Sequence, residues 1–122
     1  MNPILIVEDN EKNLKLVRDV LHFKGYRTLE AMTATEGLRL ARKELPVLIL
    51  MDIQLPDFDG ITALRKLRAD ELTRLIPVLA VSASAMPDDQ QRILASGFDA
   101  YITKPIDIKA FLETIERRLG KP

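Results

Sequence analysis

The sequence predicts an α/β domain in which a parallel sheet is covered by helices on both faces. Short apolar runs alternate with segments of helical periodicity, and each run is apolar at nearly every position. Such runs are typical of strands buried on both faces. The starts of the runs lie 23, 20, 31 and 22 residues apart, which leaves room for a crossover helix each time. The predicted strands are residues 4–7, 27–31, 47–51, 78–81 and 100–103.

The segments between the strands are predicted to be helices because their apolar residues recur at helical spacing. Residues that favour helix starts or ends flank them: a capping box at 33–36, Asp59, Pro87 and Asp107 at starts, and Gly25 and Gly97 at ends. The apolar stripes include Leu14, Val17 and Leu21, then Leu38 and Ala41, then Ile61, Leu64 and Leu67, and finally Phe111, Ile115 and Leu119. The second strand is the least apolar, so we expect it at an edge of the sheet.

Length and composition exclude several classes of protein. The 122 residues suit one domain, which we expect to span 1–122 with a core from about 4 to 119 and no output domain. The chain has no cysteine, which excludes a disulfide scaffold and a thiolate metal site. Eighteen basic residues balance eighteen acidic ones, and no apolar run could span a bilayer. We therefore expect a cytoplasmic protein without nucleic-acid or membrane partners.

Four of the five predicted strands are followed directly by side chains that can do chemistry. These side chains are Glu8 and Asp9, Asp52, Ser82, and Lys104. In a doubly wound parallel sheet, ligands bind at the edge where the strands finish, so these groups should converge there. Each has an ordinary interpretation when taken singly: Asp9 could cap the following helix, and Lys104 could be a solvated lysine.

The combination of these groups predicts a metal and phosphate site. Three carboxylates repel one another unless a cation lies among them. Carboxylate ligands without histidine or cysteine suit Mg²⁺, with Mn²⁺ as a substitute. An ammonium and a hydroxyl beside them would match the remaining phosphate oxygens. The chemistry indicated is phosphoryl transfer onto a carboxylate, or hydrolysis from one.

Four segments carry a resemblance to a known family. Residues 7–10 (Val-Glu-Asp-Asn), 51–60, 81–83 and 101–105 (Tyr-Ile-Thr-Lys-Pro) resemble, in order, the motifs of response regulator receiver domains, which are CheY-like proteins of two-component systems. The resemblance extends over nearly the whole chain and is nearest to receivers that stand alone. It implies a flavodoxin-like (βα)5 fold of three layers with strand order 2-1-3-4-5. That order places the switch point between the first and third strands, which carry the acidic residues.

The resemblance also implies roles for the acidic residues. Asp52 would accept a phosphoryl group from a phosphohistidine of a partner and hold it as an acyl phosphate. Mg²⁺ would be bound by Asp9 and Asp52, by Glu8 directly or through a water molecule, and by the backbone carbonyl of Gln54. The implied partners are a sensor histidine kinase or a histidine phosphotransferase, and a downstream protein target. We expect no enzyme activity beyond self-catalysed phosphoryl acceptance and autodephosphorylation.

The remaining motif residues have roles implied in the same way. Lys104 would pair with a phosphoryl oxygen, Ser82 would turn its hydroxyl onto another, and the small Ala83 would leave its backbone N–H accessible. Ser82 and Tyr101 would form the switch that changes the face built from helix 4, strand 5 and helix 5. A cis peptide before Pro105 would direct the lysine inward.

The roles of several other residues, and three alternative functions, remain to be considered. Asp59 and Gly60 are expected to shape the loop into the third helix, Asp57 fits no EF-hand, and His22 is expected to be a packing or surface residue. Gln54 and Ser84 occupy positions that tune dephosphorylation in the family, so the lifetime of the phosphoryl group stays open. The alternatives are a degenerate receiver that docks partners without phosphorylation, a receiver excised from a hybrid kinase or larger regulator, and a flavin or nucleotide binder. The acidic loop at 8–10 has the wrong charge for the last.

Overall fold

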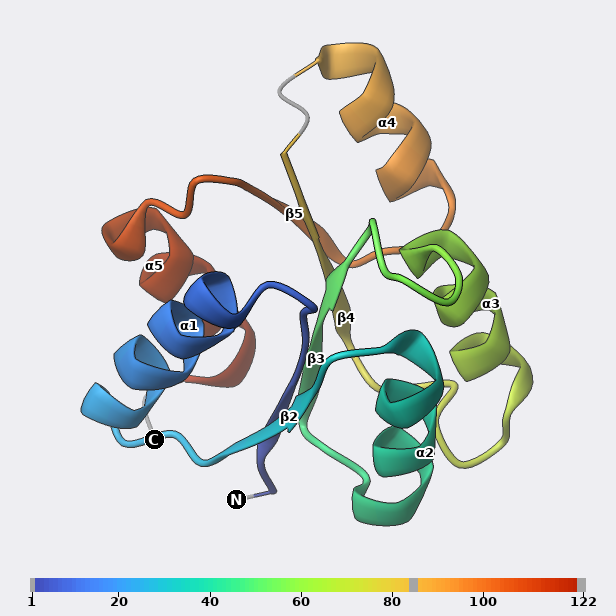
Figure 1. Cartoon of the computed structure of the whole chain (residues 1–122), viewed down its shortest axis with the longest axis horizontal. Coiled ribbons are helices and arrows are strands. Elements are labelled where there is room, and N and C mark those ends of the chain that lie inside the picture. Colours follow the sequence, from blue (N-terminus) through green and yellow to red (C-terminus); the bar gives the residue numbers. More distant parts are fainter. Residues whose placement is uncertain (1, 84–85, 121–122) are drawn as a thin grey trace.

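Five parallel strands form the centre of the molecule in the order β2-β1-β3-β4-β5. The computed structural model describes residues 2–83 and 86–120, so Ser84 lies outside the described residues. Helices α1 and α5 cover one face of the sheet, and α2, α3 and α4 lie on the other (Figure 1). The elements are β1 (Ile4–Val7), α1 (Glu11–Phe23), β2 (Thr28–Ala31), α2 (Ala34–Glu44), β3 (Leu48–Asp52), α3 (Gly60–Ala69), β4 (Val78–Ser82), α4 (Pro87–Ala95), β5 (Ala100–Thr103) and α5 (Ile108–Leu119).

The strand order and the edge position of β2 confirm the predicted fold, while the strand limits differ slightly. β2 begins one residue later than predicted, at Thr28, and the Arg27 carbonyl just before it accepts a hydrogen bond from the Ile4 N–H. β3 and β4 each extend one residue further than predicted, to Asp52 and Ser82. In register, Asp52 lies opposite Val81. Asp52 and Ser82 are therefore held in place by strand pairing within the sheet, and not by the loops that follow.

The core consists of one apolar layer on each face of the sheet. Successive side chains of a strand point to opposite faces, so a continuous apolar run fills both layers. Leu5 and Val7 of β1 pack under α2 and α3, whereas Ile4 and Ile6 pack under α1 and α5. This arrangement explains why the sequence shows runs instead of alternation.

The helix starts follow from local hydrogen bonds, most of which were predicted. Thr33, Asp59 and Asp107 cap α2, α3 and α5 by accepting from backbone N–H groups three residues on. α1 is capped by Asn10, whose side chain accepts from the Asn13 N–H, so the ordinary interpretation of Asp9 as the cap is wrong. Asp9 is left exposed at the rim of the sheet.

The fourth helix makes few contacts with the core. α4 begins at Pro87, as predicted, and buries only one side chain, Ile93. Gly25 and Gly97 follow α1 and α4 with positive φ, which is why glycine is favoured there. No helix within residues 2–83 and 86–120 is long and apolar enough to cross a membrane.

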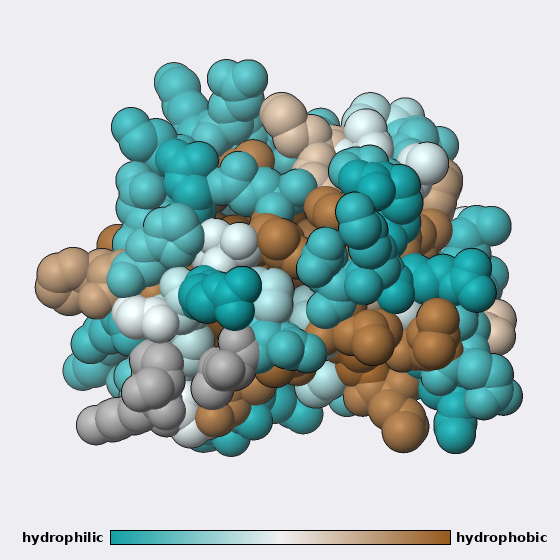
Figure 2. All heavy atoms as spheres, turned by 90° about the horizontal axis from the view of Figure 1, so that it is seen from below, coloured by the Kyte–Doolittle hydropathy of each residue, from teal (hydrophilic) through white to brown (hydrophobic). Residues whose placement is uncertain are grey.

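The edge where the strands begin has a small exposed apolar patch. Hydrophobic side chains gather on one side of this otherwise mostly hydrophilic surface (Figure 2). Leu75 is 80% exposed and Leu72 is 52% exposed. They line a surface pocket whose apolar members, called the lower patch below, are Pro46, Val47, Leu72, Leu75, Ile76 and Pro77.

Candidate functional site

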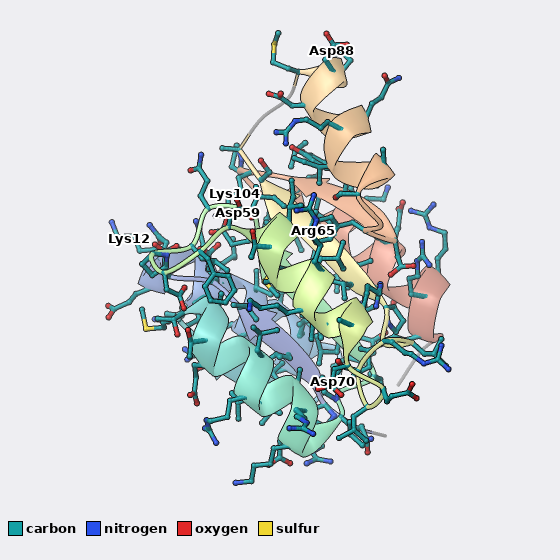
Figure 3. The ribbon with its side chains drawn as sticks, turned by 90° about the vertical axis from the view of Figure 1, so that its right-hand side faces the viewer. Lys12, Asp59, Arg65, Asp70, Asp88 and Lys104 are labelled. Carbon is teal, nitrogen blue, oxygen red and sulfur yellow. The ribbon has the colours of Figure 1, made fainter. Side chains whose placement is uncertain are left out.

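The predicted site residues converge on a cleft at the edge where the strands end. Asp52 and Ser82 are the last residues of β3 and β4, Glu8 follows β1 directly, and Lys104 follows β5. In Figure 3, Lys104 and Asp59 lie at this end of the molecule, far from Asp70 at the end of α3. The cleft holds about 340 Å³ and is lined by Asp9, Asn10, Asn13, Asp52, Gln54, Leu55, Pro56, Ser82, Ala83 and Lys104.

One lysine bridges two buried carboxylates at the centre of the site. Lys104 Nζ lies 2.8 Å from Glu8 Oε1 and 2.9 Å from Asp52 Oδ2. The carboxylate side chains are each 6% exposed and the lysine is 18% exposed. The Lys104 N–H also donates to the Ser82 carbonyl, which fixes the lysine beside β4. Low exposure strengthens these charge interactions relative to water.

The electrostatics of the cluster reflect the crowding of negative charge. Burial, followed by the hydrogen bond and the charge of Asp52, raises the pKa of Glu8 to about 7, although Lys104 opposes the change. For Lys104 itself, burial lowers the pKa, but the hydrogen bonds to Asp52 and Glu8 outweigh burial and raise it above its ordinary value. The cluster therefore favours a bound positive charge beyond the single ammonium.

The Asp52 carboxylate is oriented by the chain that follows it. Its Oδ1 accepts a hydrogen bond of 3.0 Å from the Gln54 N–H, and its Oδ2 contacts Lys104. Gly60 packs directly against this turn, because a Cβ there would lie 2.7 Å from the Asp52 carbonyl oxygen. Asp59 caps α3 at the same point, so both residues shape the loop as expected.

The acidic residues can hold a divalent cation. Glu8, Asp9 and Asp52 each offer a carboxylate oxygen, and these oxygens all lie within 4.8 Å of one another. Asp9 is exposed, whereas the other two are buried. An all-oxygen set with room for water suits Mg²⁺. The residues present therefore fit the ion that the sequence predicted.

The other predicted residues are placed as follows. Ser82 and Ala83 line the cleft, and Ala83 is exposed. The Lys104–Pro105 peptide bond is cis. Tyr101 is half-buried and packs with the layer under α2, α3 and α4, outside the cleft. His22 is exposed and its Nε2 lies 2.7 Å from Thr28 Oγ1, consistent with a surface role.

Sequence reasoning missed the part played by Asp57. Its carboxylate accepts hydrogen bonds from the Ala34 and Thr35 N–H groups and from the Thr35 hydroxyl, at the start of α2. These hydrogen bonds hold the pKa of Asp57 well below its usual range. Asp57 and Thr35 are 22 residues apart, so no local pattern indicates the contact.

Comparisons with known proteins agree with this geometry. Residues 4–116 match the response regulator receiver domain family. The chain is 50% identical over 117 residues to the polar-differentiation response regulator DivK of Brucella ovis, covering 96% of this chain and 95% of that protein.

Two solved structures show the same arrangement of elements. The receiver domain of the sensor histidine kinase PA1611 from Pseudomonas aeruginosa, solved with a magnesium ion coordinated in its active site cleft, is 33% identical, with a TM-score of 0.89 and 98% of each chain covered. A CheY-like receiver domain protein from Methanospirillum hungatei is 35% identical, with a TM-score of 0.87 and coverage of 98% and 94%. With this fold and this match along nearly its whole length, the chain belongs to the response regulator receiver domain family of two-component signalling systems.

Proposed function

We propose that Asp52 of this receiver accepts a phosphoryl group from a phosphohistidine of a sensor histidine kinase or a histidine phosphotransferase. The observation that carries the proposal is the position of the Asp52 carboxylate. It lies at the end of β3, in a cleft, with Lys104 2.9 Å away and two further carboxylates close by. Glu8 shares this burial, the ammonium and the candidate cation site, but Asp52 lines the cleft and Glu8 does not.

The residues divide the work of the transfer. A carboxylate oxygen of Asp52 attacks phosphorus, the P–N bond of the donor breaks, and the imidazole leaves with the electron pair. The Lys104 ammonium stabilises negative charge on the phosphoryl oxygens as they approach. The Ser82 hydroxyl and the Ala83 N–H, at the mouth of the same cleft, are donors for the other oxygens.

The proposed cofactor is Mg²⁺, with Mn²⁺ as a substitute. Glu8, Asp9 and Asp52, with the backbone carbonyl of Gln54, are the proposed ligands. When bound, the ion supplies positive charge that offsets the charge of the transferring group. Glu8 and Asp52 are already held in place by Lys104, at 2.8 and 2.9 Å.

We further propose that the phosphorylated protein signals through the face formed by α4, β5 and α5. Ser82 and Tyr101 are the proposed switch residues, since one lines the cleft and the other lies on β5 beside that face. The output is binding to a downstream protein. A receiver that only docks partners is the alternative, and the complete set of charged residues in the cleft argues against it.

The test is the intact mass of the protein after incubation with acetyl phosphate and Mg²⁺. Wild-type protein should gain one phosphoryl group, which is lost on standing and prevented by a chelator, whereas Asp52→Asn should gain none. Asp19→Asn is the matched control, because its carboxylate is exposed on α1 outside the cleft and should leave the gain unchanged. Phosphorylation of Asp52→Asn at another carboxylate would contradict the assignment, and absence of any gain, also with a phosphohistidine donor, would favour the docking alternative.

A further inference from the structure

The loop between β3 and α3, residues 53–59, is tied to a helix that lies elsewhere in the sequence. Asp57 Oδ1 accepts from the Ala34 N–H at 2.9 Å, and Oδ2 accepts from the Thr35 N–H at 2.8 Å and from the Thr35 hydroxyl at 2.5 Å. Both carboxylate oxygens are thus used. Such a two-oxygen contact fixes the orientation of the carboxylate as well as its position.

The contact is favoured by the chemistry of a helix start. The first N–H groups of α2 have no partners within the helix. Thr33 satisfies only the Glu36 N–H, so the Ala34 and Thr35 groups need another acceptor. A carboxylate also carries the charge that the positive end of the helix dipole attracts. The lowered pKa of Asp57 keeps it ionised, and thus in this role, at neutral pH.

The first turn of α2 also contacts the strand that carries the other acidic residues. Gly37 packs on Val7 so closely that a Cβ would lie 2.8 Å from the Val7 Cγ2 atom. Val7 is the last residue of β1, and Glu8 follows it. The Glu8 N–H donates to the Ala31 carbonyl at 2.9 Å, just before α2 begins. The start of α2 is therefore packed against the chain segment that supplies Glu8 and Asp9.

The first residues of the 53–59 loop are fixed to Asp52, the proposed phosphoryl acceptor, and to the start of α3. The Gln54 N–H donates to Asp52, and the Gly60 N–H donates to the Ile53 carbonyl at 2.9 Å. The loop is held at its start by these bonds and at its tip by Asp57. Gln54, whose backbone carbonyl is a proposed ligand, lies between Ile53, which accepts from Gly60, and Asp57, which accepts from α2.

We propose that Asp57 is a positioning residue of the receiver site, which holds the 53–59 loop against the first turn of α2 and so fixes Gln54 relative to Glu8 and Asp9. Asp57 touches no reacting atom itself. Its effect reaches the site through the loop and sets both the affinity for Mg²⁺ and the rate of phosphoryl acceptance by Asp52. The expected effect on the rate of phosphorylation rests on the proposed function. The expected effect on the structure of the 53–59 loop does not.

The test compares Asp57→Ala with Thr33→Ala, which is a matched control. Both variants remove caps from the start of α2, but Thr33 makes its capping bond to Glu36 within the helix and has no such bond to the loop. We expect Asp57→Ala to weaken Mg²⁺ binding and slow phosphorylation by acetyl phosphate about tenfold, a typical effect of losing a supporting contact of a metal site. Thr33→Ala should leave both unchanged, although it too lowers stability.

A readout without metal or phosphate separates this inference from the proposed function. Amide hydrogen exchange of residues 53–58 in the metal-free protein should become faster in Asp57→Ala and stay unchanged in Thr33→Ala. Thr35→Val removes one of the three hydrogen bonds to Asp57, so it should speed the exchange of residues 53–58 by a smaller factor. Adding Thr35→Val to the Asp57→Ala variant should cause no further change in exchange. If Asp57→Ala matches Thr33→Ala in metal affinity and loop exchange, Asp57 is only a helix cap and the inference is wrong. If wild type itself takes no phosphoryl group, the proposed function fails while the loop exchange still decides whether Asp57 holds the loop.

Discussion

A single lysine shared between two carboxylates holds the acidic cluster together. Lys104 contacts Glu8 and Asp52, and all three side chains are largely shielded from water. Breaking such a contact is costly because the remaining charge stays buried without a partner. The same contact places an ammonium beside the proposed acceptor in advance. Charge reorganisation during the proposed transfer should be correspondingly small.

Lys104→Met is expected to destabilise the metal-free protein. Glu8, whose pKa Lys104 no longer lowers, is then protonated and Asp52 is buried without a cationic partner, so the free energy of unfolding should fall by about 3 kcal/mol. Millimolar Mg²⁺ should still bind and restore part of this loss, since it supplies positive charge at the same place. Urea denaturation with and without Mg²⁺ measures both effects. Lys12→Met, at an exposed position, is the control, and equal stability of the two variants would argue against the role of Lys104.

Asp57 predicts a pH dependence of stability with a definite sign. Its pKa is lower in the folded protein than in the unfolded chain, because the Thr35 hydroxyl and two N–H groups bind the ionised form. Its contribution is therefore fully present above the ordinary aspartate pKa of about 4 and is lost as the pH falls below that value. The stability difference between wild type and Asp57→Asn should shrink from pH 6 to pH 3 in urea titrations. A difference that stays constant over this range would contradict the assignment.

At the scale of elements, close packing fixes the helices on the sheet. α2 lies on β1 through Gly37, where Val7 is 1% exposed and leaves no space for a side chain. α3 lies against the end of β3 through Gly60. Both glycines stand in the first turn of a helix that starts beside the acidic cluster. The positions of these helix starts, and of the loops before them, therefore depend on the absence of a Cβ.

Gly37→Ala should destabilise the protein although alanine favours helix. The new Cβ would meet Val7 at 2.8 Å, and a buried β-branched side chain has little freedom to move. Overpacking typically costs about 1–3 kcal/mol, more than the gain of about 1 kcal/mol in helix propensity. In a Val7→Ala background, where the space is open, Gly37→Ala should stabilise the protein instead of destabilising it. Thermal denaturation of the four proteins of this cycle checks the prediction, and a loss that persists in the Val7→Ala background would point to another cause.

The elements could be predicted from sequence where their causes are local. The apolar run of 47–51 and the caps Thr33 and Asp59 depend on neighbouring residues, and the structure confirms them. The convergence of Glu8, Asp52 and Lys104 followed from a parallel sheet whose strands finish at one edge. The hydrogen bonds between Asp57 and Thr35 could not be predicted, because they depend on how two loops meet in space. Asn10 caps α1 in place of Asp9 because it directly precedes the helix start at Glu11 and accepts from the Asn13 N–H.

At the scale of the whole molecule, the site and the proposed signalling face share one sheet. β4 and β5 are neighbours, so Ser82 in the cleft lies opposite Thr103 at the end of the strand that carries Tyr101. The lower patch lies at the other end of the strands, away from the cleft. Because the two surfaces are far apart, the response of the proposed signalling face to phosphorylation can be compared with that of the lower patch in the same molecule.

Phosphorylation is expected to change amide hydrogen exchange in α4, β5 and α5 but not around the lower patch. Ser82→Ala should still accept a phosphoryl group, since Asp52 and Lys104 are untouched, yet the exchange change in α4 and β5 should be largely lost. Exchange followed by mass spectrometry, before and after acetyl phosphate, makes the comparison. An equal response in wild type and Ser82→Ala would exclude the serine as the switch, and a change at residues 71–77 would argue against a directed response.

The single buried side chain of α4 has a thermodynamic consequence. Burying an isoleucine contributes about 1.5–3 kcal/mol, which is similar to the coupling free energy that commonly links two sites in a protein. A free-energy difference of that size between two arrangements of α4 corresponds to a minor state of roughly 1–10% of the molecules. The unphosphorylated receiver should therefore already visit a second arrangement of α4 at this low frequency. Phosphorylation is then expected to raise the population of this existing conformer rather than to create a new one.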